Sequence, residues 1–70
     1  MKRKEVESSI ISTIGYDKSE STLEIEFKNG MIYQYFDVPR KMHKKLVKAS
    51  CVDHVLNTSI RNVYPYKSVG

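Results

Sequence analysis

The sequence predicts a small α+β domain, in which a three-stranded antiparallel β-meander carries two helices on one face (β-β-β-α-α). Three observations lead to this fold class: a β-hairpin pattern in the middle of the chain, a strand-forming segment before it, and two segments of helical periodicity after it. The chain of 70 residues suffices for one hydrophobic core but not for two, so we expect a single domain.

The central hairpin is predicted over residues 23–36, LEIEFKNGMIYQYF. Its two strand-forming runs flank Asn29-Gly30, which is the strongest short-range signal for a two-residue type I′ turn. With this turn, each tyrosine of the second strand pairs with a glutamate of the first, and successive side chains alternate between the faces. The expected core face consists of Leu23, Ile25, Phe27, Ile32 and Phe36, with Gln34 as its polar member. The expected outer face consists of Glu24, Glu26, Lys28, Met31, Tyr33 and Tyr35.

The first strand is predicted over residues 9–16, SIISTIGY, which are rich in β-branched side chains. Ile10, Ile14 and Tyr16 are expected to face inward. Gly15 is expected to mark a bulge or a close backbone approach.

Both ends of the chain lack apolar periodicity. Residues 1–8 are predicted to be a flexible basic arm, and residues 67–70 a polar tail. The single domain is therefore predicted to span residues 9–66.

Two helices are predicted after Asp37-Val38-Pro39, because proline suits the first turn of a helix. The first begins at about Pro39 and continues through RKMHKKLVKAS, residues 40–50, with a buried stripe of Met42, Leu46 and Ala49. The second covers about residues 51–59 and follows Ser50 and Asp53, whose spacing resembles a capping box. Its expected core-facing side chains are Val52, Val55, Leu56 and Ile60.

Charge is segregated along the chain, whose net charge is +4. The acidic residues lie mostly in the hairpin half, whereas the basic ones gather in Lys2-Arg3-Lys4 and in residues 40–48, which favours an anionic partner. Cys51 is the only cysteine, so an internal disulfide is excluded, as is usual in a reducing cytosol. No apolar run has the length of a signal peptide or a membrane span, so we expect a soluble cytoplasmic protein that does not bind membranes.

Short motifs follow one another in a specific order: Ser8-Ser9, Gly15-Tyr16, Leu23-x-Ile25-x-Phe27 with Asn29-Gly30, Tyr33-Gln34-Tyr35, Val38-Pro39, Asn57 through Ile60-Arg61, and Tyr64-Pro65-Tyr66. Over about residues 6–66 this order resembles the KTSC domain family. That small domain occurs at the C-terminus of some lysyl-tRNA synthetases and in free-standing bacterial and phage proteins. The resemblance implies RNA binding and no enzymatic activity. Residues 50–53 depart from the Ser/Gly-rich step of the family, which leaves the angle between the helices open.

A lysine patch is predicted on the first helix, made of Lys41, Lys44, Lys45 and Lys48. Steps of three and four residues place these side chains on one continuous surface. If each met one phosphate of a single strand, the logarithm of the affinity would fall against the logarithm of the salt concentration with a slope of about −3. An ordinary solvated helix face is the alternative and the commoner explanation.

Tyr33 and Tyr35 have two interpretations. They can form a platform on which bases stack, although the expected register sets Glu24 and Glu26 beside them, where carboxylates repel phosphate. Alternatively, residues 63–66 or a second subunit cover these tyrosines, and the unpaired hairpin edge attracts a strand from elsewhere. The second, structural interpretation is the favoured one.

Arg61 follows the second helix. Arginine can hold a phosphate through two parallel hydrogen bonds, which lysine cannot. The alternative is structural, with Arg61 joining the end of the helix to Glu24 or Glu26. The two interpretations have equal weight.

The sequence contains no pattern that indicates catalysis, a metal site or a cofactor. His43 and His54 lack metal-binding spacing, and Cys51 is expected to be a small buried hydrophobic residue. The chain also lacks a glycine-rich phosphate loop, so we expect a protein that is not an enzyme.

These sequence features are compatible with three functions. The preferred one is a non-catalytic RNA-binding accessory domain, in which the lysine patch grips phosphates, Arg61 orients them, and Tyr33 and Tyr35 stack on bases. The second is a protein-interaction or homodimerisation module that adds a strand at the hairpin edge. The third is a binding protein for a small anionic nucleotide, with a pocket lined by Tyr33, Tyr35, Tyr64, Tyr66 and Arg61.

Overall fold

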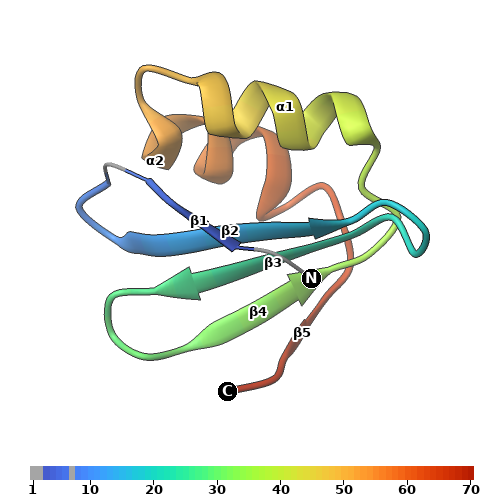
Figure 1. Cartoon of the computed structure of the whole chain (residues 1–70), viewed down its shortest axis with the longest axis horizontal. Helices are drawn as coiled ribbons and strands as arrows, with labels where there is room; N and C mark the ends of the chain where they lie inside the picture. The colour runs from blue at the N-terminus through green and yellow to red at the C-terminus, as the bar shows by residue number, and fades with distance from the viewer. Residues whose placement is uncertain (1–2, 7) are drawn as a thin grey trace.

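The computed structural model describes residues 3–6 and 8–70 and shows an α+β domain with an antiparallel sheet and helices on one of its faces (Figure 1). The five strands lie in the order β1-β2-β3-β4-β5. They are β1 (Arg3–Glu5), β2 (Ile11–Asp17), β3 (Thr22–Phe27), β4 (Ile32–Tyr35) and β5 (Tyr66–Ser68). The helical elements are α1 (Arg40–Lys48), α2 (Val52–Val55) and the π-helical turn η1 (Leu56–Ile60).

The predicted number of three strands is wrong, because the two ends of the chain supply the outer strands. Arg3–Glu5, within the predicted arm, pairs with β2, and Tyr66–Ser68, at the start of the predicted tail, pairs with β4. Residues 1, 2 and 7 of that arm lie outside the described part of the chain. Strand β4 is therefore an inner strand, and the hairpin edge that the sequence predicts to be unpaired is occupied by β5.

The irregularity in β2 lies between Ile11 and Thr13, and the expectation of a bulge at Gly15 is wrong. An extra residue in one strand changes which side chains face inward on either side of it. As a result Ile11 and Ile14 are both buried, whereas Ile10, which was expected in the core, has 36% of its surface exposed.

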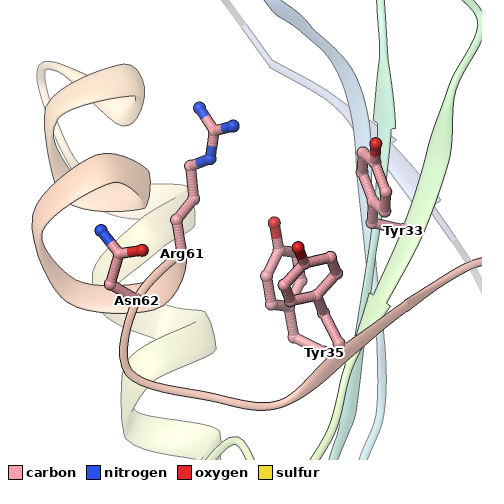
Figure 2. A pocket seen from close by; sticks show the side chains of 5 residues that line it. Tyr33, Tyr35, Arg61 and Asn62 are labelled. Carbon is pink, nitrogen blue, oxygen red and sulfur yellow. The ribbon is translucent and has the colours of Figure 1, made fainter.

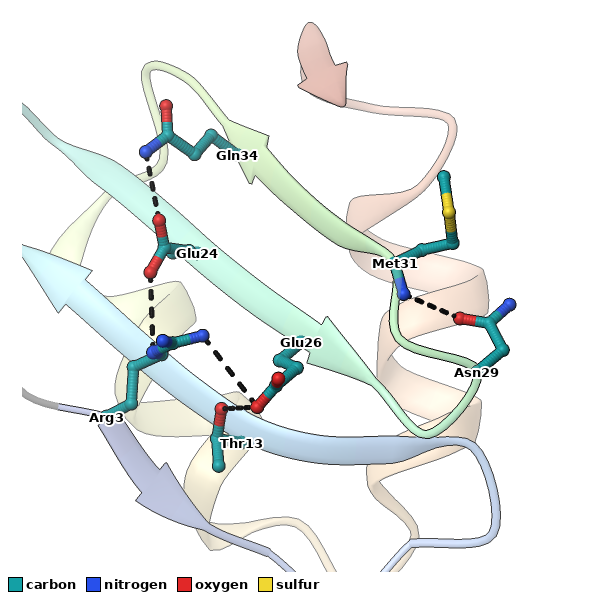
Figure 3. A network of polar contacts seen from close by, with 7 residues as sticks. All are labelled: Arg3, Thr13, Glu24, Glu26, Asn29, Met31 and Gln34. Atoms are coloured by element: carbon teal, nitrogen blue, oxygen red, sulfur yellow. Dashed lines mark hydrogen bonds and ion pairs between the residues drawn. The ribbon is translucent and has the colours of Figure 1, made fainter. Parts of the chain in front are cut away.

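The hairpin turns through three residues, Lys28-Asn29-Gly30, and the predicted two-residue turn is wrong. The N–H of Phe27 donates to the carbonyl oxygen of Met31 at 2.8 Å, and the N–H of Gly30 donates to the carbonyl oxygen of Phe27 at 3.0 Å. Gly30 has φ +91°, which fits a type I turn followed by a glycine in the left-handed region. The Asn29 side-chain oxygen also accepts from the Met31 N–H at 3.0 Å (Figure 3).

The extra loop residue shifts the register by one. Strand β4 pairs Leu23 with Tyr35 and Ile25 with Tyr33. A shift of one residue moves every side chain of a strand to the other face of the sheet. Tyr33 and Tyr35 therefore lie on the face that the helices cover, and Ile32 and Gln34 lie on the open face, the reverse of the predicted arrangement.

The core lies between the sheet and the helices, and it confirms the predicted helical stripes in part. Met42 and Val55 are half-buried against the core, and Ala49 lies just beyond the end of α1. Leu46 of α1 is fully buried, as are Leu56 and Ile60 of the second helical segment. The buried hydrophobic residues of this core are Ile11, Ile14, Leu23, Ile25, Tyr35, Val38, Leu46, Val52, Leu56 and Ile60. No helix in residues 3–6 and 8–70 is long and apolar enough to cross a membrane.

The start of α2 differs from the predicted capping box. The residue that precedes α2 is Cys51, without a side-chain cap, and its exposed thiol contradicts the expectation that it is buried. Asp53 instead accepts hydrogen bonds from the hydroxyl groups of Ser8 and Ser9. This carboxylate therefore fastens the segment before β2 to the second helix.

Candidate functional site

Three tyrosines meet on the helix-covered face, where β4 pairs with β5. Tyr35 pairs with Tyr66 in the sheet register, and their ring centroids lie 5.7 Å apart. The Tyr66 ring also meets Tyr33 edge-on, at 5.7 Å. Tyr35 is only 3% exposed, so its ring has no face for a base, which contradicts the stacking role considered for it. Tyr33 is half-buried, and Tyr66 is 60% exposed.

Arg61 faces this cluster from the helix side. The π-helical turn η1 ends with the N–H of Arg61 donating to the carbonyl oxygen of Leu56 at 2.9 Å. One turn back, the side-chain oxygen of Asn57 accepts from the Arg61 guanidinium at 3.2 Å. Figure 2 shows Arg61 and Asn62 on one side of a hollow, with Tyr33 and Tyr35 on the other. The hollow has a volume of about 130 Å³ and is lined by Tyr33, Tyr35, Arg61, Asn62 and Tyr66.

The acidic side chains of the sheet lie on the opposite face. Arg3 lies 3.5 Å from the carboxylate of Glu24 and 3.8 Å from that of Glu26 (Figure 3). Glu24 also accepts from the Gln34 amide at 3.0 Å, and Glu26 from the Thr13 hydroxyl at 3.2 Å. The structural alternative for Arg61, a bridge to one of these glutamates, is therefore wrong. The objection that the glutamates would repel phosphate from the tyrosines is also removed, since the two groups occupy different faces.

Burial raises the pKa of the Tyr35 hydroxyl above its ordinary value, and the positive charge of Arg61 partly opposes this rise. The phenol is consequently neutral near pH 7 and can both donate and accept a hydrogen bond. The hollow thus combines the permanent positive charge of Arg61 with the neutral hydroxyl group of Tyr35, a set of donors that suits an anion.

Two further hollows continue the first. The second, of about 240 Å³, is lined by Ile10, Phe27, Asn29, Tyr33 and Arg61. The third is lined by Ser9, Ile10, Phe27, Lys28 and Asn29. Because each hollow shares residues with the next, the three form one groove, which we call the tyrosine–arginine groove.

Several groove residues were not predicted as site residues. Ile10 was assigned to the core and Asn29 to a turn, and the bulge and the three-residue loop decide their actual positions. Asn62 was not considered. Tyr64, which was expected in the pocket, instead packs half-buried against the core. A long-range strand pairing and a helix end bring these residues together, so local sequence patterns carry no signal for them.

The lysine patch lies elsewhere. Lys41, Lys44, Lys45 and Lys48 are all exposed on α1, as predicted for a basic helix face. None of these four lysines lines the three hollows. The structure therefore brings Arg61 together with Tyr33 and Tyr35 but keeps the lysine patch apart from them.

The two histidines differ in their surroundings. The ring of His43 stacks on that of Tyr16, with centroids 4.8 Å apart, and His54 is exposed. Within residues 3–6 and 8–70, no group of three or more His, Cys, Asp or Glu side chains is placed to hold a metal ion.

Comparison with known proteins gives the family. The model of the KTSC domain matches residues 7–64 of the chain. The chain belongs to the KTSC domain family. A crystal structure of a KTSC domain protein from Yersinia pestis has 33% sequence identity and a TM-score of 0.93, covering 99% of this chain and 97% of that one.

Two kinds of relatives contain segments similar to this chain. An uncharacterised protein of Stutzerimonas stutzeri is 35% identical over 57 residues, which cover 81% of this chain and 80% of that protein. A lysine–tRNA ligase of Nostoc punctiforme is 30% identical over 63 residues, which cover 90% of this chain but only 11% of the ligase. The domain thus makes up most of some relatives and a small part of others.

Proposed function

We propose that this KTSC domain is a non-catalytic RNA-binding module whose main contact surface is the tyrosine–arginine groove. The observation that carries this proposal is the register of the hairpin. It places Tyr33 beside Arg61 on one face and Glu24 and Glu26 on the other, so aromatic and cationic groups share a hollow free of these carboxylates.

The chemistry of the groove supports a single-stranded ligand. An aromatic side chain that stacks on a base contributes about 1–3 kcal/mol to binding. The half-buried Tyr33 and the exposed Tyr66 can serve in this way, and the Arg61 guanidinium can hold a phosphate through two parallel hydrogen bonds. Similar segments, each 11% of the protein, occur in lysine–tRNA ligases, enzymes named for a tRNA substrate, which also supports the proposal.

The lysine patch has a secondary role in this proposal. Because it lies outside the groove, it attracts the phosphate backbone over a distance and adds affinity that depends on salt. Strand addition at the edge of β4, the second function considered, is less well supported, since β5 occupies that edge. A cytoplasmic location stays a prediction from the single cysteine.

Fluorescence anisotropy with a labelled single-stranded RNA tests the proposal, with an RNA duplex for comparison. We expect Arg61→Gln to weaken binding of the single strand about tenfold, which corresponds to about 1.4 kcal/mol. Arg40→Gln removes the same charge from an exposed arginine of α1 and serves as the matched control, with a change of about twofold or less. Equal effects of the two substitutions would contradict a role for the groove.

The salt dependence of RNA binding distinguishes the contribution of the groove from that of the lysine patch. Replacing Lys41 and Lys45 by glutamine is expected to reduce the slope of log affinity against log salt by about 1.4, because each phosphate contact on a single strand contributes about 0.7. The Arg61→Gln variant should keep more of the slope while losing more affinity at high salt. No binding of any RNA by the unaltered chain would refute the proposed function.

A further inference from the structure

We propose that the tyrosine–arginine groove recognises a single nucleoside monophosphate unit, with the phosphate in the hollow between Arg61 and the tyrosines and the base in the neighbouring hollow over Ile10 and Phe27. This inference rests on the proposed function, because it names the part of an RNA strand that the groove binds. It also predicts that one compartment of the groove binds the phosphate and the neighbouring compartment binds the base.

The first compartment suits a phosphate. Arg61 and Asn62 supply N–H donors, and the tyrosines supply hydroxyl groups. In Figure 2 the hydroxyl ends of Tyr33 and Tyr35 point the same way as the Arg61 guanidinium. Its volume of about 130 Å³ lies below the roughly 300–1,000 Å³ of pockets that enclose a whole small molecule. The compartment therefore has room for a phosphate group and not for a nucleotide.

The second compartment suits a base. It shares Tyr33 and Arg61 with the first, so the two are adjacent. Its apolar lining comes from Phe27, whose ring lies 5.5 Å from that of Tyr33, and from Ile10, which the β2 bulge leaves 36% exposed. A base has two apolar faces and a polar edge, so it buries the faces against such side chains.

Asn29 supplies a polar group for the edge of the base. Its side-chain oxygen accepts from the Met31 N–H at 3.0 Å, so the orientation of the amide is fixed (Figure 3). The other end of the amide is an NH₂ group, which donates to a ring nitrogen or carbonyl of a base. Lys28 lines the continuation of the groove and can meet the next phosphate of a strand.

Backbone amide chemical shifts of the full chain test the inference. The probes are inorganic phosphate, adenosine, adenosine 5′-monophosphate (AMP) and tetra-adenylate, each at low and high salt. We expect AMP to shift residues of both compartments, inorganic phosphate those around Arg61 and Asn62, and adenosine those around Ile10 and Phe27. Tighter binding of tetra-adenylate than of AMP assigns the unit to an RNA strand, and equal binding assigns it to a free nucleotide.

Two variants separate the compartments. Arg61→Gln should weaken binding of AMP and of phosphate about tenfold each. Ile10→Ala should weaken AMP about fivefold and leave phosphate unchanged, since it removes only apolar surface from the base compartment. Val69→Ala, an exposed apolar residue outside the three hollows, is the matched control and should change neither. Dispersed spectra of each variant establish that it folds.

These experiments distinguish a failure of the RNA-binding function from a failure of the nucleotide site. If RNA binds and the shifts stay within α1, the RNA-binding function survives and the nucleotide site is refuted. If AMP binds with the expected pattern and no RNA binds, the nucleotide site holds and the RNA-binding function is refuted. If no probe shifts Arg61, Tyr33 or Phe27, the nucleotide site is refuted. Equal effects of Ile10→Ala on AMP and on phosphate would also overturn the assignment of the base compartment.

Discussion

The positive charge of Arg61, at the end of the helical segment, acts on the hydroxyl group of Tyr35, which lies on the sheet across the same hollow. The guanidinium is anchored by Asn57, one helical turn before it, and it faces a hollow that the buried Tyr35 also lines. Burial raises the pKa of Tyr35, and the Arg61 charge lowers it by favouring the phenolate. The charge of Arg61 can therefore be detected at Tyr35 without any ligand.

We expect the pKa of Tyr35 to rise further in the Arg61→Gln variant, because burial then acts without the opposing charge. The chemical shift of the carbon that bears the Tyr35 hydroxyl, followed through the alkaline range, reports this pKa. Arg40→Gln should leave it unchanged. An unchanged or lowered pKa of Tyr35 in Arg61→Gln would show that the guanidinium does not face the hollow.

Asp53 gives a second prediction at the scale of single residues. Hydrogen bonds from the hydroxyl groups of Ser8 and Ser9 hold the pKa of this carboxyl below its ordinary value of 3.8. A carboxyl with a lowered pKa stabilises the folded state above its unfolded pKa, and this stabilisation is lost as the pH falls through the folded pKa.

Asp53→Asn should therefore reduce the free energy of unfolding at neutral pH and flatten its decrease below about pH 4. Urea unfolding at a series of pH values measures both effects. Glu20→Gln, which neutralises an exposed carboxylate in the turn before β3, is the control and should change neither. A neutral-pH stability of Asp53→Asn equal to that of the unaltered chain would mean that the two serine contacts are energetically unimportant.

At the scale of elements, one loop decides which face of β4 carries the tyrosines. The Asn29-Gly30 pair indicates a hairpin correctly, but it is compatible with turns of two or three residues, which differ by one in register. In this chain Gly30 occupies the left-handed position of the three-residue loop at φ +91°. The identity of the groove depends on this conformation, since a two-residue turn would move Tyr33 away from Arg61.

We expect Gly30→Ala to lower the free energy of unfolding by about 1 kcal/mol, because a residue with a Cβ adopts a positive φ only at a cost. An added Cβ at this position meets nothing within 4 Å, so the cost comes from the backbone alone. Gly30→Asn should lower the free energy of unfolding by less than Gly30→Ala, since asparagine tolerates a positive φ. Denaturant unfolding compares the two variants, and a larger loss with asparagine would argue against this loop conformation.

At the scale of the whole molecule, the sheet places different chemistry on each surface. One face carries Arg3 between two glutamates, and the other carries the core and the groove, with the lysine patch on the outer side of α1. Strand β5 contributes Tyr66 to the groove and also covers the backbone groups of β4. A single short strand thus completes the site and protects a sheet edge.

A chain that ends at Pro65 should self-associate, because the exposed backbone of β4 can pair with a second copy. Sedimentation velocity over a range of concentrations measures this, with a chain that ends at Val69 as the control. We expect a mass that rises with concentration only in the shorter chain. A monomer at all concentrations would show that β5 is unnecessary to block edge pairing.

The elements that depend on local rules could be predicted from the sequence. The inward-facing Leu46, Leu56 and Ile60, the hairpin at Asn29-Gly30 and the α+β class follow from side-chain periodicity and turn chemistry, and the structure confirms them. The polar, exposed lysine patch on α1 was predictable for the same reason. Arg61 and Tyr33 were recognised as candidates from residue type and motif, without knowledge that they meet.

The register of the hairpin, the two outer strands and the groove depend on tertiary packing. The register depends on one loop residue, which local preference does not fix, and each step of one residue exchanges the two faces of a strand. The outer strands β1 and β5 are short and polar, so they are formed by pairing with a neighbouring strand and not by their own preferences, and β5 pairs with a strand distant in sequence. The groove combines a β2 bulge, a hairpin loop, a helix end and a C-terminal strand, and such long-range packing has no counterpart in the local pattern of the chain.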